Sequence, residues 1–162
     1  MSGKYFRSAF RLSLSIVLAS SLVSCGGGGN GGGNNTTAVV TTTTFSSTLA
    51  GSSETPPNTS TASGLGSVVA DSATMAMVAS IATSGLTGTA AHIHEGAVGV
   101  AGATIFPLTE TTPGSGKWGT SVVLTDAQLA TLKAGGYYFN VHSAAFPVGE
   151  IRGQIRASGV VF

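Results

Sequence analysis

Three histidines are the residues of this sequence whose type and spacing could do chemistry. His92 and His94 lie two positions apart in Ala-His-Ile-His-Glu, and His142 ends the run Tyr-Tyr-Phe-Asn-Val-His. On a β-strand, His92 and His94 point to the same face, with backbones roughly 6.6 Å apart, so both imidazoles can reach one metal ion. If the strand of His142 is a neighbour, the three rings form an open three-nitrogen site that suits copper or zinc.

A structural role for the same histidines is the alternative. The rings can hydrogen-bond the sheet and its turns, for example by holding the Gly-rich segment 95–102 against the loop 143–149. Polar groups satisfied in this way specify one packing without binding a ligand. If a metal binds, Glu54, Glu95 or Glu150 would accept a hydrogen bond and fix a tautomer. The sequence therefore requires no cofactor, and names copper or zinc as the cofactor of an occupied site.

Glu54, Glu150 and Arg152 form a second group. An Arg152 guanidinium held between two carboxylates would clamp the Pro56-Pro57 turn onto the last strand through bidentate hydrogen bonds. A site for a ligand carboxylate is the alternative. No Gly-x-Ser-x-Gly elbow occurs, and no Asp lies near a His in the sequence, so no catalytic residue and no enzyme activity is predicted.

The N-terminus has the pattern of an export signal. Residues 1–24 combine a basic start with an apolar stretch that is shorter than the roughly 20 residues of a spanning helix. The stretch ends in Leu-Val-Ser-Cys, which resembles the bacterial lipobox, and Cys25 is the only cysteine. We therefore expect lipid attachment at Cys25 and a location in the bacterial cell envelope. The outer membrane is favoured in a two-membrane cell because Gly26, and not Asp, follows the cysteine.

Residues 25–40 are rich in Gly, Asn and Thr and are expected to act as a flexible tether. Removal of residues 1–24 leaves four basic and six acidic residues, so the net charge changes from +1 to near −2. No basic run remains, which excludes a nucleic-acid partner. The expected partners are the membrane, through the lipid, and a protein or another component of the envelope.

Residues 41–162 are expected to form the folded domain. Short β-permissive runs separated by Gly, Pro or Ser predict strands at 42–49, 66–71, 74–82, 89–94, 103–108, 119–124, 137–141 and 150–157. Thr-Asp-Ala-Gln at 125–128 is a capping-box pattern, and Gly135-Gly136 ends the short helix that it begins. These patterns predict an all-β fold with one short helix, namely a Greek-key antiparallel β-sandwich of the immunoglobulin or superoxide dismutase kind.

Three motifs in register resemble the CHRD (chordin-type) domain. They are Leu-Ala-Gly-Ser-Ser-Glu-Thr-Pro-Pro at 49–57, Ala-His-Ile-His-Glu-Gly at 91–96 with Gly99 and Gly102, and 136–155, from Gly-Tyr-Tyr-Phe-Asn-Val-His-Ser to Gly-Glu-Ile-Arg-Gly-Gln-Ile. The resemblance spans roughly residues 45–156. It implies a β-sandwich, an extracellular setting and a non-enzymatic binding or structural module.

The segment 85–95 also resembles the copper-ligand strand of Cu,Zn superoxide dismutases, in which Gly-Leu precedes a His-x-His pair. By that resemblance, His92 and His94 would be copper ligands. The sequence lacks further histidines for the bridging and zinc positions, and it has no pair of cysteines for a disulfide. Dismutase activity is therefore not expected.

Overall fold

The structure is a computed structural model that describes residues 41–158. The predictions for residues 1–40, namely the export signal, lipidation of Cys25 and the tether, lie outside the described residues. In chain order the described elements are β1 (Thr42–Ala50), a 3-10 turn η1 (Gly51–Ser53), β2 (Ser63–Asp71), β3 (Ala76–Ser84), β4 (Gly88–Glu95), β5 (Thr104–Glu110), β6 (Lys117–Val123), α1 (Asp126–Lys133), β7 (Tyr137–Ser143), β8 (Ile151–Gln154) and β9 (Arg156–Ala157).

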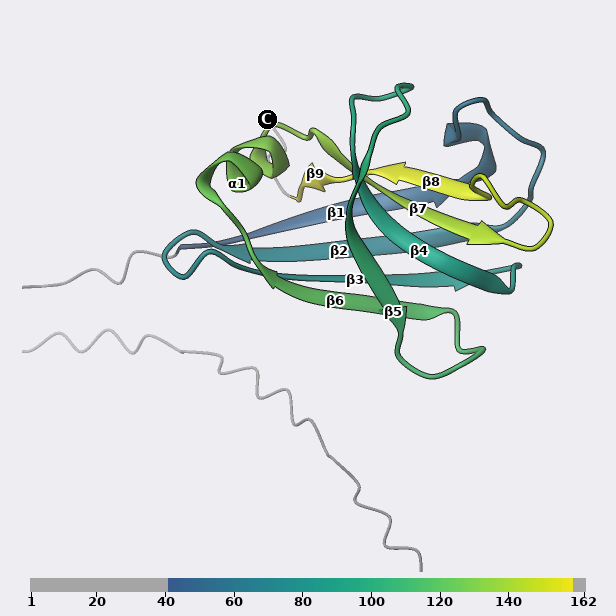
Figure 1. Cartoon of the computed structure of the whole chain (residues 1–162), viewed down its shortest axis with the longest axis horizontal. Coiled ribbons are helices and arrows are strands. Elements are labelled where there is room, and N and C mark those ends of the chain that lie inside the picture. The colour runs from purple at the N-terminus through teal and green to yellow at the C-terminus, as the bar shows by residue number, and fades with distance from the viewer. Residues whose placement is uncertain (1–40, 159–162) are drawn as a thin grey trace, which may run out of the picture. The chain divides into compact units, whose positions relative to one another are not determined.

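Nine strands of the described chain form one antiparallel sheet, and eight of them, all except β9, close into a ring. The strand order is β2-β3-β6-β5-β4-β7-β8-β1-β9, and β1 also pairs with β2. Closure depends on β1, because it pairs with β2 along its whole length from Thr42 to Ala50 and also with β8, where Ala50 lies opposite Arg152. In Figure 1, β1, β2, β3 and β6 run side by side behind the steeply crossing β4 and β5.

The sheet wraps around an apolar interior. Buried and exposed residues alternate strictly along β1, β2 and β3, so each of these strands places every second side chain inside. The fully buried side chains include Phe45, Leu49, Val68, Met77, Phe139 and Ile151. Gly66 makes room for this packing, because a Cβ there would lie 2.5 Å from the Phe139 ring.

The expected all-β antiparallel fold with one short helix is confirmed. The sheet, however, is closed and barrel-like, and not specifically a Greek-key sandwich. Residue alternation alone does not distinguish the two, because one face of every strand is buried in both. The predicted strand 150–157 is two strands, since the Ile155 N–H donates to the Tyr137 carbonyl at a break between β8 and β9. The capping box is present, with Thr125 and Gln128 hydrogen-bonded reciprocally.

A second, polar layer lies on the outer face of β4, β7 and β8. Cross-strand pairing places His92 opposite Asn140 and Asn140 opposite Arg152. The next row consists of His94, Tyr138 and Gln154. Loops cover much of this layer, so Asn140 and Arg152 are buried although they lie outside the barrel interior. These rows position the candidate site.

Candidate metal centre

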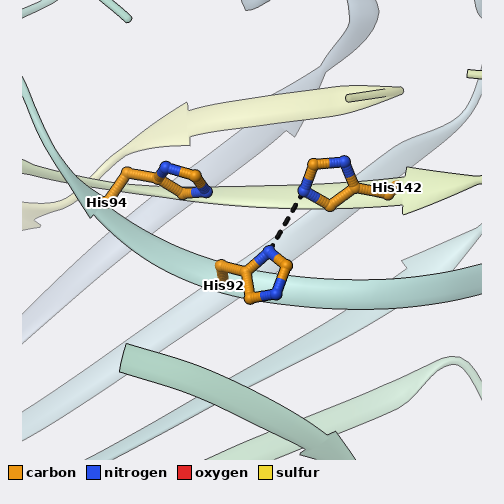
Figure 2. Close-up of side chains that lie close together, drawn as sticks. All are labelled: His92, His94 and His142. Carbon is orange, nitrogen blue, oxygen red and sulfur yellow. Dashed lines mark hydrogen bonds between the residues drawn. The ribbon is translucent and has the colours of Figure 1, made fainter. Parts of the chain in front are cut away.

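The three histidines converge on one point of the outer layer. One potential ligand nitrogen from each of His92, His94 and His142 lies within 4.8 Å of the other two. Figure 2 shows the three rings from β4 and β7 turned toward one another. The closest pair is His92 Nδ1 and His142 Nε2, which lie 3.1 Å apart. All three side chains are half-buried. Strand alternation predicted a shared face for His92 and His94, and the pairing of β4 with β7 brings His142 to the same face.

Backbone carbonyls orient two of the three rings. His94 Nδ1 lies 3.0 Å from the Gly102 oxygen, and His142 Nδ1 lies 3.1 Å from the Pro147 oxygen. A carbonyl only accepts, so each Nδ1 carries the proton and each Nε2 keeps its lone pair. The Nε2 atom of His94 is buried without a hydrogen-bond partner among the described residues. A lone pair held in this way is the arrangement that metal-binding histidines have.

The electrostatics favour neutral imidazoles. Burial lowers the pKa of His92, and the positive charges of His142 and His94 lower this pKa further. Burial also lowers the pKa of His94, with smaller contributions from His142 and Arg152, although the bond to Gly102 opposes the shift. Neutral imidazole is the form that binds metal. The donor set therefore fits a borderline ion such as Zn²⁺ or Cu²⁺, with His92 Nδ1, His94 Nε2 and His142 Nε2 as ligands.

A stack of three side chains supports His94. Its ring lies parallel to that of Tyr138, with centroids 5.1 Å apart and planes 12° apart. The Arg152 guanidinium carbon lies 3.4 Å from the centroid of the Tyr138 ring. The Gly102 peptide joins the two rings, since its N–H donates to the Tyr138 hydroxyl at 3.0 Å and its oxygen accepts from His94. These contacts together fix the plane of the His94 ring.

Tyr138 and Gly102 are the supporting residues that sequence reasoning did not single out. The signal for Tyr138 was its place on the same strand face as Asn140 and His142. The need for glycine at position 102 is visible only in the structure, because a Cβ there would overlap the Glu95 backbone oxygen. Only glycine allows the backbone to approach so closely.

Arg152 fastens the turn that follows β1, although with acceptors other than those predicted. Its guanidinium donates to Thr55 Oγ1 at 3.2 Å and to the Ala97 oxygen at 2.9 Å. Among the described residues no hydrogen bond joins it to Glu54 or Glu150, so the bidentate carboxylate clamp is corrected to a hydroxyl and a carbonyl. The physical reason is register, because β8 places Arg152 beneath the 96–102 loop.

Glu150 holds the same turn by another route. Ser60 Oγ donates to Glu150 Oε1 at 2.7 Å, and Asn58 Nδ2 donates to the Glu150 backbone oxygen at 3.0 Å. Glu54 is buried, and Oε1 has no partner among the described residues. Burial raises the pKa of Glu54, while the Thr55 N–H and the Arg152 charge oppose that rise.

Comparison with protein families identifies the domain. The family model for the CHRD domain matches residues 45–155, and this chain therefore belongs to the CHRD domain family. Membership suggests a non-enzymatic binding or structural module. Neither the search of curated proteins nor that of solved structures finds a match. Among the described residues, the structure contains no helix with the length and apolar character needed to cross a membrane.

Proposed function

We propose that this protein is a lipid-anchored module outside the cytoplasm that acts by binding and not by catalysis. Membership in the CHRD family supports the non-enzymatic part of the proposal. The apolar stretch before Leu-Val-Ser-Cys supports export and lipidation at Cys25, and the Gly/Asn-rich residues 26–35 suit a flexible tether. The bacterial cell envelope is the proposed location.

Copper or zinc is the bound species that the geometry supports best. The observation that carries this second proposal is the convergence of three imidazole nitrogens within 4.8 Å of one another. The buried, unpartnered Nε2 of His94 supports it further, because a buried acceptor without a partner costs about 1–3 kcal/mol that a metal ion would recover. The half-buried rings leave the fourth coordination position for water or an exchanging ligand. Such a site suits the buffering or relay of metal ions.

Metal titration of the full-length protein tests the second proposal. We expect one Cu²⁺ or Zn²⁺ per chain by elemental analysis, and nitrogen hyperfine splitting in the Cu²⁺ electron paramagnetic resonance spectrum. His92→Asn and His142→Asn should each abolish stoichiometric binding. Thr89→Asn, which introduces the same amide at an exposed position of the same strand, is the matched control and should retain the ion. Absence of stoichiometric metal in the unaltered protein, or binding unchanged in both histidine variants, would contradict the proposal.

Fatty-acid labelling tests the anchor separately. Cells that express the protein are grown with radioactive palmitate, and label is expected on the protein but not on the Cys25→Ala variant. Incorporation that survives Cys25→Ala would contradict lipidation at this residue. The result does not depend on the histidines, so the two proposals stand or fall independently.

A further inference from the structure

The outward side of β1, β2, β3 and β6, called the four-strand face below, carries only two charged residues. The four strands run side by side (Figure 1), and cross-strand pairing arranges their outward side chains in rows. The three complete rows are Thr48, Leu65, Ala82 and Lys117, then Ser46, Ser67, Ser80 and Gly119, then Thr44, Val69, Val78 and Ser121. After the third row, Thr42 pairs with Asp71 and Ala76 pairs with Val123. Among these positions, Asp71 and Lys117 alone are charged.

Several large apolar side chains of the four-strand face are exposed. Leu65 is 69% exposed, Val78 is 56% exposed and Val123 is 74% exposed. Apolar side chains gathered on one face and rimmed by polar residues mark an interaction surface. Serine and threonine hydroxyls lie between them, and the hydrocarbon of a membrane would leave those hydroxyls without hydrogen bonds. The composition of the face therefore fits a protein surface better than a lipid surface.

The two charges of the four-strand face have opposite signs and lie at opposite corners. Leu65, six positions before Asp71 in β2, shares its row with Lys117, and β3 lies between β2 and β6. Strand geometry therefore separates Asp71 from Lys117 by roughly 20 Å. A partner that covers the face must present a base and an acid with the same separation. A second copy related by a two-fold axis does so by symmetry, because residue 71 of each copy then faces residue 117 of the other.

The shape of the four-strand face agrees with the same symmetry. A two-fold axis that brings Asp71 over Lys117 also brings the third row of one copy over the second row of the other. Val69 and Val78 then lie over the small residues of that second row, namely Ser67, Ser80 and Gly119. Large side chains opposite small ones allow two facing layers to interdigitate.

We propose that the four-strand face binds a second copy of this chain in a two-fold symmetric dimer, with Asp71 of each copy paired with Lys117 of the other. The face measures roughly 20 by 20 Å, so the pair buries roughly 800 Å². Stable complexes bury about 1,200–2,000 Å², and association in dilute solution is therefore weak. Copies held on one membrane by the lipid anchor proposed above have a raised effective concentration, which favours a weak dimer. The contact between the faces does not itself require the anchor.

Carbodiimide cross-linking of the purified full-length protein tests the proposal without a membrane. The reagent joins a carboxylate to an amine that touches it and leaves no spacer. At about 1 mM protein, which populates complexes of millimolar Kd, we expect a covalent dimer. Mass spectrometry should find an amide bond between Asp71 and Lys117, which must join two copies because the residues of one copy are roughly 20 Å apart. Absence of this bond would overturn the proposal. Its presence in a protein that incorporates no fatty acid would support the dimer and remove the anchor.

Charge reversal tests whether the partner is a second copy. Asp71→Lys places lysine against lysine, and Lys117→Asp places aspartate against aspartate, so each variant alone should associate about tenfold more weakly. An equimolar mixture restores opposite charges at both contacts and should recover the affinity of the unaltered protein in sedimentation equilibrium. Lys133→Asp, at an exposed position of α1, is the control and should have no effect. A mixture that does not recover, or an equal loss in Lys133→Asp, would overturn the proposal.

A change at the centre of the face avoids Asp71, whose Oδ1 also accepts from the Ala73 N–H in the following turn. Ser80→Arg introduces a large cation at an exposed position of the second row and should abolish the Asp71–Lys117 cross-link. Thr104→Arg, at an exposed position of β5 outside the face, is the matched control and should retain it. Circular dichroism checks that both variants are folded. Equal cross-linking of the two folded variants would overturn the proposal.

Discussion

The Nδ1 atom of His92 lies 3.1 Å from the Nε2 atom of His142, although the two residues are 50 positions apart in the chain. Strands β4 and β7 bring them together, because Ala90 lies opposite His142 and His92 lies opposite Asn140. At this distance the two nitrogens share a single proton or a single metal ion, since two N–H groups pointing at each other would repel. In the proposed metal centre, both nitrogens would face the same ion.

Acid should destabilise the metal-free domain through His92 and His94. Both have a pKa below the ordinary value of about 6.5 in the folded state, so the unfolded chain binds more protons in mildly acidic solution. Above about pH 6.5 the two histidines do not change the free energy of unfolding with pH. Below that value the free energy of unfolding decreases as the pH falls. Thermal melts in EDTA at pH 8, 6.5 and 5.5 should show this decrease. The double variant with His92→Gln and His94→Gln should show a flatter dependence, and parallel curves for the two proteins would refute the assignment.

Arg152→Leu should lower the free energy of unfolding by about 2–4 kcal/mol. The change removes the bonds to Thr55 and Ala97 and the contact with the Tyr138 ring, from a residue that is almost fully buried. Urea unfolding followed by circular dichroism measures the difference. Arg156→Leu, at an exposed position in β9, is the control and should stay within about 0.5 kcal/mol of the unaltered protein. Similar losses in both variants would argue against a fastening role for Arg152.

Gly102→Ala should weaken metal binding about 10- to 100-fold, the usual effect of disturbing a residue that orients a ligand. The new Cβ would overlap the Glu95 oxygen, so the 96–102 loop must move and its carbonyl must leave His94 Nδ1. Isothermal titration with Zn²⁺ gives the affinity. Gly119→Ala is the matched control, because its nearest neighbour would be at an ordinary 3.5 Å. Unchanged affinity in Gly102→Ala would show that the loop does not position His94.

Glu54→Gln should stabilise the domain at neutral pH and lose that advantage in acid. The folded-state pKa of Glu54 is raised, mainly by burial, so the folded chain binds the proton more readily than the unfolded chain. Stability from this group is therefore present below the unfolded pKa of about 4.3 and decreases as pH rises through the folded value. Melting temperatures of both proteins at pH 4 and pH 7.5 give the comparison. An advantage of the glutamine variant that grows in acid would contradict this sign.

Strand alternation was sufficient to predict the shared face of His92 and His94 and most of the strands, whereas the approach of His142 depends on the pairing of β4 with β7. The period of two places His92 and His94 on one face whatever their neighbours are, and the capping box at Thr125 depends only on local spacing. The partners of Arg152 could not be predicted, because they depend on the register between β7 and β8 and on a loop that folds back over them. Closure of the sheet could not be predicted either. It depends on the pairing of β1 with both β2 and β8, and the sequence of β1 does not indicate its partners.

The stacked side chains of His94, Tyr138 and Arg152 give the outer layer a further property. The histidine end belongs to the proposed metal centre and the arginine end holds Thr55 in the turn after β1, with one aromatic ring between them. Thermodynamic linkage requires that any stabilisation of this turn by a metal ion equals the gain in metal affinity that an ordered turn provides. A metal ion at the proposed centre would therefore also steady the turn after β1, which lies on the far side of the Tyr138 ring from His94.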